Sequence, residues 1–102
     1  MPISGNTSSF NSTSIRNAPN TAGVYALYDG ALLIYYGRAQ GGDVTISSRL
    51  QSHLRGDEGP GTKAATNFAA ETCSNPVARE QELLNEFEEQ NGSLPRCNSR
   101  VG

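Results

Sequence analysis

The sequence is poor in the features that mark membrane-spanning, secreted and zinc-thiolate proteins. Its two cysteines, Cys73 and Cys97, lie far apart and form no CxxC or Cys/His spacing, so a zinc site is not indicated and we expect both thiols to be reduced. No apolar run approaches membrane-spanning length, and the N-terminus lacks the basic-then-apolar pattern of a signal peptide. We therefore expect a cytoplasmic protein.

The sequence also lacks an excess of positive charge. Eight Lys and Arg residues against ten Asp and Glu give a formal net charge of −2, so bulk electrostatics do not indicate a nucleic-acid binder. The charges are unevenly distributed, however. Five acidic residues lie between residues 80 and 89, whereas Arg38, Arg49, Arg55 and Lys63 occupy the middle of the chain. This distribution allows a local basic surface on an acidic protein.

The length of 102 residues indicates one domain with a modest core. Residues 1–14 are mostly Ser, Thr, Asn and Gly, so we expect a flexible arm there, extended or poorly ordered, with Phe10 and Ile15 as anchors. The domain proper is expected over residues 15–102.

The strongest pattern in the chain is a β-hairpin at residues 23–37. Two runs rich in β-branched, aromatic and aliphatic residues, 24–28 and 31–36, flank Asp29-Gly30, a dipeptide that tolerates positive φ. All four tyrosines of the chain fall within this hairpin.

The loop length decides which tyrosines share a face of the hairpin. A two-residue loop would pair Tyr25 with Ile34 and send Tyr35 to the other face. A three-residue loop with a bulge would set Tyr25 opposite Tyr35 and aim both hydroxyls at one place. If the two phenols act together, the sequence predicts the odd-length loop.

A first helix is predicted from about Thr45 to Arg55. Its apolar residues recur at spacings of four and form one stripe, Ile46, Leu50 and Leu54. Asp43 or Thr45 can cap its start and Gly56 its end. Arg49 and His53 fall on the edges of the stripe, one turn apart.

A third strand is predicted at Phe68–Cys73, followed by a last helix from Pro76 to about Gln90 that ends at Asn91-Gly92. Together with the hairpin and the first helix, these segments predict an α+β fold. Its sheet would be small, three-stranded and antiparallel, with helices packed on it.

Glu80 is the sharpest anomaly of the last helix because it lies on the apolar stripe, three and four residues before Leu83 and Leu84. A carboxylate in such a place needs a cation or hydrogen-bond donors to offset desolvation. One interpretation is structural, with the acid paired to the helix dipole and to a neighbour such as Arg49. The other is functional, and the helix pattern alone leaves both open.

These segments resemble the catalytic domain of the GIY-YIG endonuclease superfamily. The matching pieces are Pro19 ahead of Gly23-Val24-Tyr25, Tyr35-Tyr36-Gly37 followed by Arg38, Arg49-Leu50 with His53, Glu80 followed by Leu83-Leu84, and Leu94-Pro95 leading to Asn98. They span residues 15–98 in the order that the family has. Tyr36 stands where the family usually carries an aliphatic residue, and the acidic pI is atypical.

The resemblance implies a metal-dependent phosphodiesterase. Glu80 would hold one divalent ion, Mg²⁺ or Mn²⁺, because a hard ion that keeps most of its waters needs only one protein carboxylate. Arg49 would bind the scissile phosphate and stabilise the charge that builds on it, while Arg38 would contact backbone phosphate.

The resemblance also implies that Tyr25, Tyr35 and His53 surround the attacking water. A tyrosine with a pKa of about 10 is a poor base, whereas a neutral histidine is competent at pH 7. We therefore assign Tyr25 to orient or relay and His53 to help take the proton. Asn98, which can both donate and accept, would orient a tyrosine or a phosphate oxygen.

Each of these residues has an interpretation that needs no function: a solvated helix edge for Arg49 and His53, a turn for Asn98, a surface charge for Arg38.

We consider three functions for a chain with these residues. The first is an endonuclease that cuts DNA at nicks, branches or a short sequence, with a partner protein or a homodimer supplying specificity. The second is a catalytically silent module of the same fold that binds nucleic acid or a protein. The third is an enzyme acting on RNA. The complete set of site residues favours an active enzyme.

Overall fold

A computed structural model describes residue 3 and residues 7–98 of the chain. Its elements, in chain order, are β1 (Ser8–Ser9), α1 (Ser12–Arg16), β2 (Gly23–Asp29), β3 (Leu32–Ala39), α2 (Ile46–Arg55), α3 (Pro60–Lys63), β4 (Asn67–Thr72) and α4 (Pro76–Asn91). The fold is α+β with an antiparallel sheet, as predicted, but the sheet has four strands rather than three.

The strand order is β1-β4-β2-β3, so β3 lies at one edge of the sheet. The additional strand comes from the predicted N-terminal arm, where Ser8 pairs with Phe68 of β4. Asn11 then caps α1 by accepting a hydrogen bond from the backbone of Ser14. Residues 7–14 therefore contribute a strand and the start of a helix that their polar composition did not reveal, while residues 1, 2 and 4–6 lie outside the described residues.

The predicted hairpin is present, but the predicted pairing of Tyr25 with Tyr35 is wrong. Asp29 pairs with Leu32 across a two-residue turn, and Tyr25 lies opposite Gly37. A bulge near Leu27 changes the register by one residue, which returns Tyr25 and Tyr35 to the same face. Tyr25 and Tyr35 are therefore diagonal neighbours across the two strands. The extra residue that brings them to one face is the bulge within β3, not an additional residue in the loop.

The predicted bounds and caps of helix α2 are confirmed. Thr45 accepts a hydrogen bond from the backbone N–H of Ser48, and the Ser48 hydroxyl accepts one from the backbone of Thr45. Gly56 ends the helix in the left-handed conformation, with φ of 87°.

Helix α4 also begins and ends close to its predicted limits. Asn75 caps its start, Pro76 occupies its first position, and Gly92 ends it with φ of 81°. The preceding strand, β4, begins and ends one residue earlier than predicted. Among the described residues, the helices are too short or too polar to cross a membrane.

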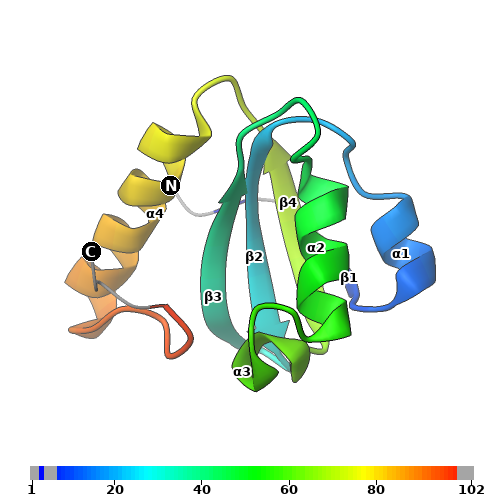
Figure 1. Ribbon diagram of the computed structural model, residues 1–102. Helices are drawn as coiled ribbons and strands as arrows, with labels where there is room; N and C mark the ends of the chain where they lie inside the picture. The colour runs from blue at the N-terminus through cyan, green and yellow to red at the C-terminus, as the bar shows by residue number, and fades with distance from the viewer. Residues whose placement is uncertain (1–2, 4–6, 99–102) are drawn as a thin grey trace.

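Helices cover both faces of the sheet, with α1 and α2 on one side and α4 on the other (Figure 1). The α2 side buries Tyr25, Leu27 and Ile34 of the hairpin against Ile46 and Leu50. The α4 side buries other hairpin residues against the same helix that carries Glu80: Val24, Ala26 and Tyr36 pack with Leu83. The edge strand β3 therefore runs between α2 and α4, and side chains from all three can meet there.

Candidate functional site

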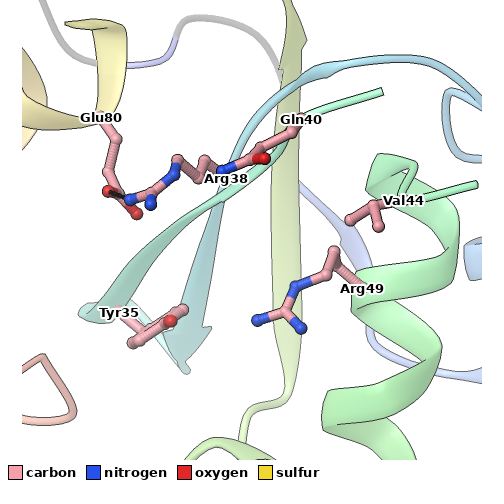
Figure 2. Close-up of a pocket in the computed structure, with 6 residues that line it drawn as sticks. All are labelled: Tyr35, Arg38, Gln40, Val44, Arg49 and Glu80. Atoms are coloured by element: carbon pink, nitrogen blue, oxygen red, sulfur yellow. Dashed lines mark hydrogen bonds and ion pairs between the residues drawn. The ribbon is translucent and has the colours of Figure 1, made fainter. Parts of the chain in front are cut away.

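Two adjoining cavities lie at the edge of β3, between α2 and α4. The first, of about 320 Å³, is lined by Tyr35, Arg38, Gln40, Val44, Arg49 and Glu80 (Figure 2). The second, of about 390 Å³, is lined by Tyr35, Arg38, His53, Glu58, Thr62, Glu80, Leu84, Cys97 and Asn98. Because three residues line both cavities, we treat them as one cleft. All the predicted site residues line this cleft except Tyr25.

Tyr25 lies behind the cleft and is completely buried. Its ring passes over Gly37, where an added Cβ would come within 2.4 Å of the phenol oxygen. Glycine at that position therefore makes the space that the ring occupies. Burial, followed by the neighbouring Tyr35, raises the pKa of the Tyr25 phenol, so it is neutral at pH 7.

Tyr25, Tyr35 and His53 form one aromatic cluster. The ring centroids of Tyr25 and Tyr35 are 6.2 Å apart, and the His53 ring lies 5.5 Å from the first and 5.1 Å from the second. The convergence of two phenols and one imidazole, expected from segments far apart in the sequence, is therefore present. Tyr35 is the phenol that faces the cleft.

His53 is more deeply placed than the helix pattern predicted, with 1% of its surface exposed. Its Nε2 lies 2.8 Å from the Tyr25 hydroxyl, and its Nδ1 lies 2.9 Å from the hydroxyl of Thr62. Burial lowers the pKa of His53 from 6.5 to about 4, assisted by the positive charge of Arg49 and opposed by Glu58. The imidazole is therefore neutral at pH 7, with both nitrogens engaged.

Arg49 reaches into the cleft from α2, and Figure 2 shows its guanidinium directed toward the space between α2 and β3. It forms an ion pair with Glu58 at 3.1 Å, and both side chains are about one-third exposed. Glu58 was not among the predicted site residues, since it lies in the loop after α2 and no periodic pattern marks it. The pair is accessible to solvent, so its partners can exchange for a ligand.

Glu80 of α4 and Arg38 of β3 meet in direct contact at one wall of the cleft (Figure 2). Their closest N and O atoms are 2.6 Å apart, and the Glu80 side chain is 15% exposed. The partner of Glu80 is thus Arg38 on β3, and the alternative that named Arg49 as its partner is wrong. Within the described residues, Nε of Arg38 is buried with no hydrogen-bond partner.

The Glu80 carboxylate also affects the pKa of Tyr35. Burial raises the pKa of its phenol, and the negative charge of Glu80 raises it further, while the charge of Arg49 acts in the opposite direction. The phenol is therefore a neutral donor at pH 7, placed between the acidic and the basic walls of the cleft.

Asn98 secures the chain after α4 to the edge of β3. Its side-chain amide donates to the Tyr36 carbonyl and accepts from the Tyr36 N–H, each at 2.9 Å. The N–H of Cys97 also donates to the carbonyl of Ile34. Both polar groups of the Asn98 side chain are thus committed to backbone, so Asn98 shapes the cleft by holding one wall in place.

The carboxylates and imidazole of the described chain do not form a preassembled metal site: no group of three or more His, Cys, Asp or Glu side chains could hold an ion there. An ion in the cleft would therefore take no more than two of these side chains and complete its coordination shell with waters.

No protein-family model matches the chain, and no curated protein matches it significantly.

Proposed function

We propose that the protein is a divalent-metal-dependent endonuclease that hydrolyses phosphodiester bonds in DNA. The observation that carries the proposal is the meeting of the Glu80 carboxylate with two guanidinium groups, a phenol and a neutral imidazole in one cleft. These groups come from β3, α2 and α4, and their order along the chain resembles that of the GIY-YIG endonucleases.

One Mg²⁺ or Mn²⁺ ion fits the chemistry of Glu80. Its carboxylate borders both cavities, and a hard ion with a shell of waters requires only one such ligand. When bound, the ion would supply a Lewis acid for a phosphate oxygen and the leaving group. Arg38 holds the same carboxylate in the free protein, so the ion and Arg38 compete for Glu80.

Arg49 is the residue that we assign to the scissile phosphate. A guanidinium is always charged and donates two parallel hydrogen bonds, which suits a phosphate that gains charge as it is attacked. Its exposed pair with Glu58 is weak enough to be replaced by phosphate. Arg38, once released from Glu80, would contact a neighbouring phosphate.

Tyr35, Tyr25 and His53 form the side of the cleft that we assign to the attacking water. Tyr35 borders the cleft and orients the water by hydrogen bonding. Tyr25 is behind it, in contact with Nε2 of His53, which is neutral at pH 7. We assign His53 to help take the proton, and its lowered pKa makes it a weak base for this step. In this assignment the proton leaves the water through the phenols and reaches His53.

The proposed substrate is intracellular DNA, with a nick, a branch or a short sequence as its target. With a net charge of −2 and few basic groups near the cleft, the chain would bind DNA weakly and with a strong salt dependence. A partner protein or a second copy of the chain would then supply specificity.

The Arg38–Glu80 ion pair favours one alternative, a silent module of the same fold that binds nucleic acid or a protein. In such a module the acid would serve only to hold Arg38. An enzyme that cuts RNA is the other alternative, and the cleavage assay described next includes an RNA substrate to detect it.

The experiment compares nicking of supercoiled plasmid, branched DNA and single-stranded RNA by the wild-type chain in Mg²⁺, Mn²⁺ or EDTA. Arg49→Ala removes the proposed phosphate ligand, and Arg55→Ala is the matched control because Arg55 is exposed on the same helix. We expect metal-dependent nicking that falls roughly 100- to 1,000-fold in Arg49→Ala and stays unchanged in Arg55→Ala. Absence of cleavage of every substrate in both metals would contradict the proposal.

A further inference from the structure

Thr62 is a buried polar residue that no motif or periodic pattern of the sequence marks. It lies in the short helix α3 with 4% of its surface exposed, and it borders the second cavity of the cleft. Its hydroxyl oxygen is 2.9 Å from Nδ1 of His53. The other ring nitrogen, Nε2, is 2.8 Å from the hydroxyl of Tyr25. The imidazole is thus held between two hydroxyl groups.

The direction of these two hydrogen bonds follows from which hydroxyl has access to water. A neutral imidazole has one N–H donor and one nitrogen acceptor. Tyr25 is completely buried, so its phenol proton needs an acceptor inside the protein. Nε2 of His53 offers a lone pair at hydrogen-bond distance, while Arg49, which also hydrogen-bonds this hydroxyl, can only donate to it. The oxygen of Tyr35 is the other neighbour of the hydroxyl. Thr62 borders the cavity, so its own proton can be donated to water or to a ligand there.

We propose that Thr62 is a positioning residue that fixes the tautomer of His53. By accepting a hydrogen bond from Nδ1–H, the Thr62 oxygen keeps the ring proton on Nδ1 and leaves Nε2 as the acceptor that faces Tyr25. Because the Thr62 oxygen accepts this hydrogen bond, its own O–H is left to donate into the cleft. A hydroxyl donor at that position suits an anionic oxygen, such as that of a phosphodiester.

The inference rests on the proposed function for its consequence, because Nε2 is the atom assigned to accept the proton. The tautomer of His53 can be measured whether or not the protein cuts DNA. The energetic reason is that Arg49 already donates to the Tyr25 oxygen. The reversed tautomer would make this oxygen accept from Nε2–H as well, and the phenol proton would then have to turn from His53 to the oxygen of Tyr35.

The test uses the fact that His53 is the single histidine of the chain, so its ring nitrogens give the only imidazole signals in the spectrum. ¹⁵N NMR of the intact protein at neutral pH distinguishes a protonated from an unprotonated ring nitrogen. We expect Nδ1 to be protonated in the wild type. Thr62→Ser keeps the hydroxyl and should keep this tautomer, whereas Thr62→Val removes the acceptor and should shift the population toward Nε2–H.

A wild-type spectrum with the proton on Nε2 would overturn the inference, even if Thr62→Val did not fold. An unchanged tautomer in folded Thr62→Val would overturn it as well. Plasmid nicking separates this result from the proposed function. If the protein cuts DNA, we expect Thr62→Val to reduce the rate on the order of 10- to 100-fold, as for outer partners of other functional histidines, with Thr62→Ser restoring it. A protonated Nδ1 without nicking would support the inference and contradict the endonuclease assignment.

Discussion

Mild acid should destabilise this protein through His53, because burial holds the pKa of its imidazole at about 4 in the folded state, against 6.5 for the exposed side chain. Between these two values the unfolded chain binds the proton and the folded chain does not, so unfolding becomes easier as the pH falls. The stabilising contribution is complete above the unfolded pKa and is lost as the pH falls through the folded pKa.

The magnitude follows from the populations of the two states. At about pH 5.0, nearly all unfolded molecules carry the proton on this imidazole, whereas only a small fraction of folded molecules do. Relative to about pH 7.5, the free energy of unfolding should therefore decrease by roughly 2 kcal/mol from His53 alone. Arg49 adds to the effect and Glu58 opposes it, since both charges act on the ring.

The assay is urea unfolding of the wild type and of His53→Gln at both pH values. The glutamine side chain does not titrate, so the pH-dependent loss should shrink to a few tenths of a kcal/mol in the variant, although the variant is less stable at every pH. An NMR titration of the wild type should show only a small protonated fraction of the imidazole at about pH 5, with the midpoint near 4. Titration near 6.5, or equal pH dependence in the two proteins, would show that burial does not keep His53 neutral in mild acid.

Three substitutions test other contacts of the cleft. Gly37→Ala places a Cβ within 2.4 Å of the Tyr25 ring, so we expect a loss of roughly 1–3 kcal/mol in urea unfolding, and an unchanged stability would show that the ring moves freely. Asn98→Ala removes two hydrogen bonds to Tyr36, so the Tyr36 amide should exchange with solvent at least tenfold faster, which hydrogen-exchange NMR measures. Arg38→Gln removes the competitor for Glu80, so Mn²⁺ binding followed by electron paramagnetic resonance should strengthen by up to about fivefold, and unaltered binding would separate Glu80 from the metal.

The local signals in the sequence were strong enough to predict the main elements. Thr45 and Gly56 mark the ends of α2, and Pro76 and Gly92 those of α4, because helix starts and left-handed termini depend on one or two residues. The hairpin was predicted from two runs rich in β-branched, aromatic and aliphatic residues on either side of Asp29-Gly30. The register of the hairpin was not predicted, because the bulge lies within the strand pair and the turn residues do not determine it.

The candidate site was predicted in part. Tyr35, Arg49, His53 and Glu80 do border one cleft, because spacing on a helix or strand determines which side a residue faces. The partners of these residues were not predictable. Thr62 and the Arg38–Glu80 pair depend on contacts between segments far apart in the sequence, which no local pattern records.

We propose that Glu80 holds the divalent ion for phosphodiester cleavage in this cleft. The most direct test is the rate at which Glu80→Ala nicks supercoiled plasmid in Mg²⁺, with Glu89→Ala, exposed on the same helix, as the matched control. The account predicts that nicking is abolished in Glu80→Ala, retained in Glu89→Ala, and that both variants remain folded. Wild-type nicking by folded Glu80→Ala would contradict it.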